Sequence, residues 1–131
     1  MKRKTLFFLF SCSTVFAFAA NTFVTTHGDD AQDGTSWESS MSSIQAAIDA
    51  SSSGDTVFIA EGTYNQSVKL KDGVHLLGGY DPSTGKRDYE TFPTVLDGTN
   101  LGKALISQGS AFKTPTYFDG LILQNAHHSS N

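Results

Sequence analysis

The sequence predicts an all-β protein in which short parallel strands form coils that stack on one another behind a single N-terminal helix. Ser, Thr and Gly make up close to a third of the 131 residues, and this composition favours turns and short strands over long helices. After residue 54, strand-like runs of three to five residues alternate with turns. Residues 55–59, 72–76 and 119–123 share one pattern: Asp, a small or polar residue, an aliphatic residue, any residue, an aliphatic residue. Short strands that recur in this way are typical of a coil that stacks on itself.

The N-terminus predicts a secretory signal peptide over residues 1–19. A basic start at residues 2–4 precedes a mostly apolar run, and Ala17 and Ala19 supply the small residues of a cleavage site after Ala19. A membrane anchor is one alternative, although the apolar run is shorter than the ~20 residues that a span requires. A lipoprotein is another, because residues 9–12 resemble a lipobox ending in Cys12. We therefore expect export, with no membrane-spanning segment after cleavage.

Charge and cysteine content narrow the partners and the compartment. Removing residues 1–19 takes away three of the nine basic residues and none of the thirteen acidic ones, which leaves a net charge of −7. An acidic surface argues against binding to a phosphate backbone, so we expect no nucleic acid partner. The single cysteine, Cys12, leaves with the signal peptide. An exported domain without disulfides suits the envelope of a Gram-negative bacterium, and we expect the protein to be secreted or held at the cell surface or outer membrane.

Residues 20–54 are expected to form an N-terminal strand, an acidic loop and a cap helix. Residues 21–26 are an extended run, and residues 27–35 are polar and rich in turn-forming residues. A helix is predicted over residues 36–51, capped by a Ser near its start and ended by Gly54. Its apolar stripe has helical spacing and consists of Trp37, Met41, Ile44, Ala47 and Ile48. A helix with one apolar face must lie on another element.

Residues 55–131 are expected to form the coils. Strands are predicted at residues 55–60, 67–70, 74–77, 94–96 and 104–107, and one last strand at residues 117–123. A long polar loop at residues 80–93 interrupts the series. The interval from Asp72 to Asp119 then fits one coil that carries this loop as an insertion.

Short motifs follow one another in a fixed order from residue 28 onward. They are GDD (28–30), DGTSW (33–37), IQAAIDA (44–50), GDTV (54–57), GTY (62–64), VHLLGGY (74–80), PTVLDG (93–98) and FDGLILQN (118–125). In this order they resemble secreted right-handed parallel β-helix proteins of the pectin-lyase-like superfamily, in particular Bacteroidetes-type surface proteins related to polymorphic outer-membrane β-helix proteins. The resemblance implies a right-handed parallel β-helix with an N-terminal cap helix and its first two to three coils. Such proteins usually run to many coils, so we expect the chain to be the N-terminal portion of a longer one.

Two acidic groups could carry chemistry, and each has a structural alternative. Asp29, Asp30 and Asp33 could bind Ca²⁺, which takes six to eight oxygen ligands; the alternative is a structural turn. Asp72, Asp97 and Asp119 each precede Gly. Paired carboxylates can cleave glycosides, whereas Asp-Gly is also a common turn dipeptide.

A lyase would also need a basic residue. Outside the signal peptide the only arginine is Arg87, on the loop. No lyase motif is matched, so we assign no catalytic residue and no cofactor other than the Ca²⁺ alternative.

Aromatic residues are the candidates for ligand contact. Exposed aromatic rings beside a flat β-face can stack on sugar rings, and Tyr64, Tyr80 and Tyr89 are the candidates for contact with a polysaccharide or a host cell-surface glycan. The alternative is that these rings cover the core. The favoured function is therefore a non-catalytic, adhesin-like surface protein that contacts glycans or matrix. The alternative function is the leading piece of a polysaccharide lyase or glycoside hydrolase whose active coils lie beyond residue 131.

Overall fold

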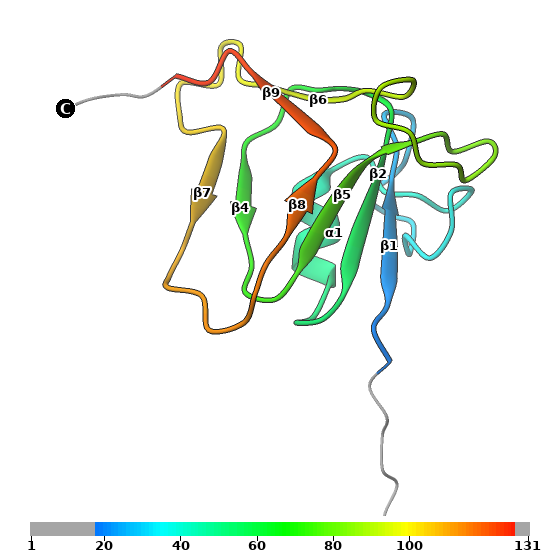
Figure 1. Cartoon of the computed structure of the whole chain (residues 1–131), viewed down its shortest axis with the longest axis horizontal. Coiled ribbons are helices and arrows are strands. Elements are labelled where there is room, and N and C mark those ends of the chain that lie inside the picture. The colour runs from blue at the N-terminus through cyan, green and yellow to red at the C-terminus, as the bar shows by residue number, and fades with distance from the viewer. Residues whose placement is uncertain (1–17, 128–131) are drawn as a thin grey trace, which may run out of the picture.

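The computed structural model describes residues 18–127 and contains three parallel sheets and one short helix in that range (Figure 1). The prediction of a signal peptide falls almost wholly on residues outside the described range. Sheet A consists of β1 (Asn21–Val24), β2 (Thr56–Ala60), β5 (His75–Tyr80) and β8 (Phe118–Asp119). Sheet B consists of β3 (Gly62–Tyr64), β6 (Thr94–Asp97) and β9 (Leu121–Gln124), and sheet C of β4 (Val68–Leu70) and β7 (Ile106–Gln108). From β2 onward the chain visits sheets A, B and C in turn and then repeats that order.

The register aligns apolar side chains in columns across each sheet. In sheet A, Val57 pairs with Leu76 and Leu76 pairs with Phe118. In sheet B, Tyr64 pairs with Leu96, which pairs with Leu123. Because strand side chains alternate between two faces, every second residue of these strands points into a shared core. That core includes Val57, Tyr64, Leu76 and Leu96, all buried.

Glycines shape the junctions between sheets A and B. The register shifts between Phe58 and Ala60 opposite β5, where Gly79 has φ +87 and lies so close to Tyr89 that a Cβ atom would stand 2.8 Å from its Cα. Gly120, with φ +69, turns the chain from β8 in sheet A into β9 in sheet B. The prediction of one last strand over residues 117–123 is therefore wrong, because left-handed backbone at Gly120 divides it into two strands of different sheets.

The internal repeat read from the sequence implies a register that differs from the one in the structure. The repeat equates Val57 with Val74 and with Leu121, whereas the structure pairs Val57 with Leu76 and places Leu121 in sheet B opposite Thr94. The similar pattern of the three segments comes from the turn before each strand rather than from equivalent positions in one sheet. The short strand β3 has only three residues, and the sequence analysis did not identify it as a strand.

The helix α1 (Ile44–Ala50) is shorter than predicted and begins at the cap Ser43, whose hydroxyl accepts a hydrogen bond from the N–H of Ala46. Trp37 is outside the helix, and Met41 forms a parallel bridge with Val24 of β1. The helical spacing of Trp37 and Met41 with the true helix was therefore misleading. The other members of the stripe, Ile44, Ala47 and Ile48, are buried against the sheets as predicted.

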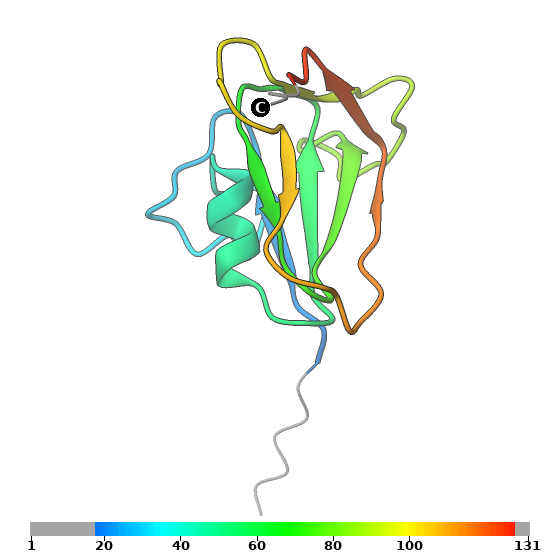
Figure 2. The same ribbon diagram turned by 90° about the vertical axis from the view of Figure 1, so that its left-hand side faces the viewer.

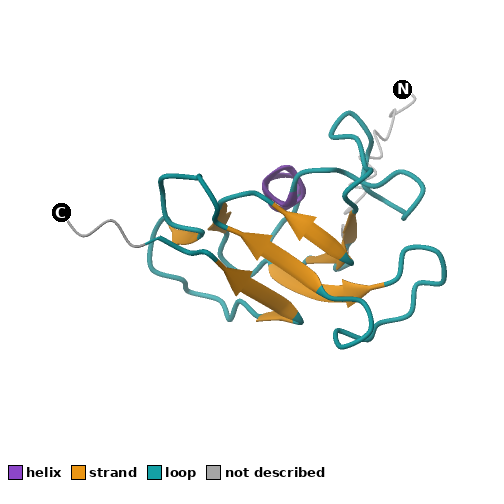
Figure 3. Ribbon diagram, turned by 90° about the horizontal axis from the view of Figure 1, so that it is seen from above, coloured by secondary structure: helices purple, strands orange, loops and turns teal. Residues whose placement is uncertain are grey.

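Helix α1 also closes one edge of sheet C. The amide of Gln45 accepts from the N–H of Lys69 at 2.7 Å and donates to the Lys69 carbonyl at 3.3 Å, so it occupies both backbone groups as a neighbouring strand would. Gln66 forms the converse pair, accepting from the N–H of Ile44 and donating to the carbonyl of Ser42. Figure 2 places α1 at one side of the molecule and β8 and β9 at the other, and Figure 3 shows the helix lying on one side of the strands.

The side formed by β8 and β9 is apolar and uncovered. Phe118 is 50% exposed and Leu123 is 45% exposed, although both lie in columns whose earlier members are buried. No further strand pairs with β8 or β9 among the described residues. Within residues 18–127, no helix combines the length and the apolar character needed to cross a bilayer.

Candidate functional site

Four aromatic rings form a cluster on the outer face of sheet A. Phe23 of β1, Phe58 of β2 and Tyr80 at the end of β5 follow one another across the sheet, and Trp37 lies against Phe23 and Tyr80. Ring centroids are 4.7 Å apart for Phe23–Trp37, 5.5 Å for Phe23–Phe58, 4.9 Å for Phe58–Tyr80 and 5.6 Å for Trp37–Tyr80. All four side chains are half-buried. We call these four residues the aromatic cluster.

Arg87 holds the 81–92 loop against this cluster. Its guanidinium lies 5.8 Å from the centroid of the Tyr80 ring, its Nε donates to the carbonyl of Gly78 at 3.0 Å, and its Nη2 contacts Asp119 Oδ2 at 2.6 Å. The hydrogen bond from Arg87 lowers the pKa of Asp119 below its usual value, and the positive charge of Arg87 adds to that effect. Arg87 thus contacts Gly78 and Tyr80 of β5 as well as Asp119 of β8, so its charge serves the fold.

A cleft of about 380 Å³ opens beside Trp37, between the 27–40 loop and the start of the 81–92 loop. Both loops project from the same side of the sheets (Figures 1 and 3). The apolar part of the cleft comes from Trp37 and Pro82, and its polar lining is Thr25, His27, Asp29, Gln32, Glu38 and Ser40. Small-molecule sites are usually mostly apolar with a few polar groups; this cleft is more polar than that and offers one aromatic ring, Trp37, among hydrogen-bonding side chains.

The three tyrosines predicted to contact glycans lie in different surroundings. Tyr64 is 2% exposed, its hydroxyl donates to the carbonyl of Ala60, and burial raises its pKa. Its ring therefore has no free face, and for Tyr64 the alternative of core cover applies. Tyr80 belongs to the aromatic cluster. Tyr89 is 56% exposed and lines a separate hollow with Asp119 and residues 120–122.

The three aspartates of the 27–40 loop, Asp29, Asp30 and Asp33, accept hydrogen bonds from nearby backbone N–H groups. Asp30 Oδ1 accepts from the N–H groups of Ser42 and Ser43. Asp33 Oδ1 accepts from the N–H and hydroxyl of Thr35 and from the hydroxyl of Ser39, and these hydrogen bonds, led by the Thr35 N–H, lower the pKa of Asp33. Within residues 18–127 no group of three or more His, Cys, Asp or Glu side chains could hold a metal ion.

The three Asp-Gly aspartates are not brought together as a pair of catalytic carboxylates. Asp72 accepts from the N–H groups of Lys113 and Thr114, and Asp119 pairs with Arg87. Asp97 accepts from the N–H and hydroxyl of Thr99 and from the side chains of Asn125 and Gln124. The hydroxyl of Thr99 and the amide of Asn125 contribute most to lowering the pKa of Asp97. Each carboxylate thus stabilises backbone or side chains of a neighbouring turn.

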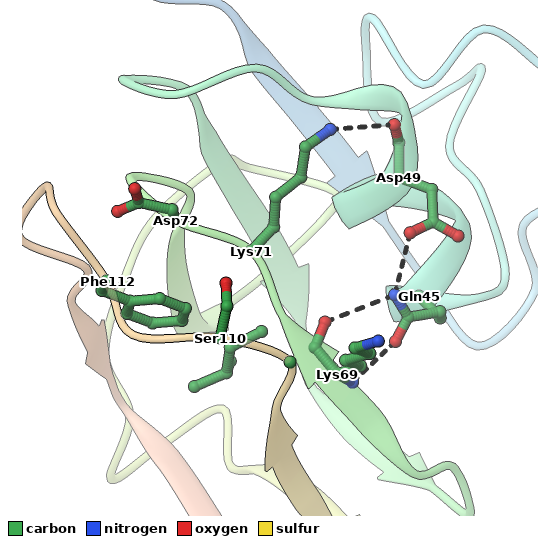
Figure 4. A pocket seen from close by; sticks show the side chains of 9 residues that line it. Gln45, Asp49, Lys69, Lys71, Asp72, Ser110 and Phe112 are labelled. Atoms are coloured by element: carbon green, nitrogen blue, oxygen red, sulfur yellow. Dashed lines mark hydrogen bonds between the residues drawn. The ribbon is translucent and has the colours of Figure 1, made fainter.

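A larger groove, about 490 Å³, runs between α1 and sheet C (Figure 4). Most of its polar side chains already serve the fold. The Lys71 amine donates to the carbonyls of Asp49 and Ser51 at the end of α1, and Gln45 binds Lys69 and Asp49. Because these groups already form hydrogen bonds within the fold, few polar groups of this groove remain available to a ligand.

Sequence analysis missed Trp37 as a site residue because its spacing to Met41 and Ile44 matched a helical stripe. The signal that could have found it is the turn-rich composition of residues 27–35, which places a nearby large aromatic ring at the surface. Comparison of the chain with known protein families, with curated proteins and with solved structures found no match.

Proposed function

We propose that the chain is the N-terminal portion of a right-handed parallel β-helix protein of the pectin-lyase-like kind. The support is the repeated order of sheets A, B and C along the chain and the parallel pairing in all three. Crossovers between parallel strands of one sheet are right-handed in almost all proteins. The short strands agree with a coil of three straight sides joined by bends.

Its function is to contact glycans at the bacterial surface or outside the cell, without catalysis. The observation that carries this proposal is the half-buried ring of Trp37, which belongs to the aromatic cluster and lines a cleft with polar walls. One face of a pyranose ring is lined by C–H groups, and such a face stacks on an aromatic ring while its hydroxyl groups bind polar side chains. The expected signal peptide at residues 1–19 supports export from a Gram-negative cell.

Intrinsic fluorescence tests the proposal at the site itself, because Trp37 is the only tryptophan of the chain. The full chain is titrated with hexasaccharides of β-1,4-glucan, β-1,3-glucan, chitin and galacturonan. We expect at least one of them to change the intensity or wavelength of Trp37 emission in a saturable way. If none of the four hexasaccharides changes the emission of Trp37, the proposal is wrong.

Calorimetry with variants gives the matched control. Trp37→Ala should abolish the heat of binding, and Trp37→Phe should retain part of it because a ring remains. Tyr117→Ala removes an exposed ring, 62% exposed, that contacts His75 rather than the aromatic cluster, and should bind as the wild type does. Equal loss in Trp37→Ala and Tyr117→Ala would show that the site lies elsewhere.

A further inference from the structure

The cleft at Trp37 has a marked excess of negative charge in its walls. The 27–40 and 81–92 loops together contribute seven acidic and two basic side chains: Asp29, Asp30, Asp33, Glu38, Asp81, Asp88 and Glu90 against Lys86 and Arg87. Asp29 and Glu38 line the cleft directly and are exposed, whereas the described lining includes no Lys or Arg. Arg87 is already paired with Asp119 at 2.6 Å.

The acidic side chains differ in how far the fold has engaged them. Asp30, Asp33, Asp81 and Asp88 each accept hydrogen bonds from neighbouring backbone or hydroxyl groups. Asp29 accepts from the N–H of Ala31. The carboxylate of Glu38 accepts no hydrogen bond from the described part of the chain, so it is free to meet a ligand or to repel one.

From this arrangement we infer that the cleft binds a neutral oligosaccharide and discriminates against acidic ones such as uronates. The inference rests on the proposed function and adds its ligand class. Trp37 supplies an aromatic surface for a neutral pyranose ring, and the exposed side chains of Asp29 and Gln32 supply acceptors and donors for its hydroxyl groups. A uronate would bring a negative charge within a Debye length of Asp29 and Glu38, about 8 Å at physiological salt, where repulsion is only partly screened.

The experiment compares two hexasaccharides of equal length, neutral β-1,4-glucan and galacturonan, by Trp37 emission of the full chain. At low salt we expect the neutral sugar to bind at least about tenfold more tightly. At 0.5 M NaCl the gap should narrow, because screening relieves only the repulsion. Equal affinities, tighter binding of galacturonan, or a gap that salt leaves unchanged would overturn the inference while the proposed function stands.

A charge variant separates repulsion at the site from other causes. Glu38→Gln keeps the size of the side chain and removes its charge, so it should strengthen galacturonan binding several-fold and leave the neutral sugar nearly unchanged. Glu90→Gln removes one charge from the facing loop outside the cleft lining and should alter neither affinity by as much. If Glu38→Gln has no effect on galacturonan, or if both sugars weaken together, the inference is wrong. If neither of these two sugars changes the emission of Trp37, the inference is wrong. The titrations with chitin and β-1,3-glucan hexasaccharides then test the proposed function separately.

Discussion

Thr94 joins three backbone groups at the junction of sheets A and B. It is fully buried, and its hydroxyl oxygen accepts from the N–H of Gly79 at 2.9 Å. The same hydroxyl donates toward the carbonyl of Ala60 at 3.1 Å and lies 3.3 Å from that of Ile59. Thr94→Val keeps the shape and leaves the N–H of Gly79 buried without an acceptor. Such a group costs about 1–3 kcal/mol, so the free energy of unfolding measured in urea should fall by that amount.

The hydroxyl of Tyr64 is a second donor to the Ala60 carbonyl that Thr94 contacts, and its loss should have a smaller effect. The Tyr64 hydroxyl donates to that carbonyl at 3.1 Å. Tyr64→Phe should cost less, about 0.5–1 kcal/mol, because Ala60 keeps the hydroxyl of Thr94 and no donor is stranded. A larger loss in Tyr64→Phe than in Thr94→Val would contradict this account of the junction.

Asp97 makes stability depend on pH at the acid end. Its pKa lies below the ordinary value of 3.8 in the folded protein, chiefly through the hydroxyl of Thr99. Since the unfolded chain takes up the proton first as the pH falls, the contribution of Asp97 is complete above about pH 4 and declines below it. The urea midpoint of the wild type should therefore exceed that of Asp97→Asn at pH 7, and the difference should shrink towards pH 2. A midpoint difference between the wild type and Asp97→Asn that stays constant from pH 7 to pH 2 would mean that Asp97 is not held by its turn in solution.

Among the elements, helix α1 depends on three buried side chains of one face. Ile48 is 1% exposed, and Ile48→Asp would bury an unpaired charge there. We expect a loss of about 3 kcal/mol or more, visible as a large drop in melting temperature. Ala50→Asp introduces the same charge on the exposed side of the helix and should cost far less. Similar melting temperatures for the two variants would show that α1 does not rest on the sheets.

The Gln45 amide is expected to protect the first edge of sheet C. Gln45→Ala should speed hydrogen exchange at the N–H of Lys69, which would lose its acceptor. Gln66→Ala should instead speed exchange at the N–H of Ile44 and leave Lys69 protected. Unchanged exchange at Lys69 in Gln45→Ala would mean that another group covers that edge.

At the scale of the molecule, residues 1–131 taken on their own are predicted to associate through the uncovered side of β8 and β9. Open strand edges with exposed apolar side chains pair readily with other chains. Light scattering should therefore give a mass that rises with concentration, and Leu123→Lys should lower it by placing a charge in the exposed column. Ala50→Lys places the same charge on the exposed side of α1, at the other side of the molecule, and should not lower the mass. A monomer at every concentration would contradict the prediction.

Sequence patterns predicted the strand-rich composition, the position of most strands and the buried face of α1, since these follow from local alternation and spacing. They did not predict the register, because Val74 and Leu76 are both aliphatic and only the pairing of whole strands decides which of them faces Val57. They also missed the cleft, because Trp37 and Pro82 meet only when two loops far apart in sequence fold to the same side.

The outer edges of β1 in sheet A and β4 in sheet C are already occupied, and this limits how copies of the chain can associate. Segment 34–41 occupies the outer edge of β1, with Phe23 donating to the carbonyl of Gly34 and Met41 donating to that of Phe23; Gln45 does the same for β4. In those two sheets only the β8 and β7 edges can accept a strand. Two copies joined through their open edges would form an isologous, self-closing pair, whereas a filament requires both edges of every copy. For residues 1–131 taken on their own, association through sheets A and C should therefore give pairs and no fibre.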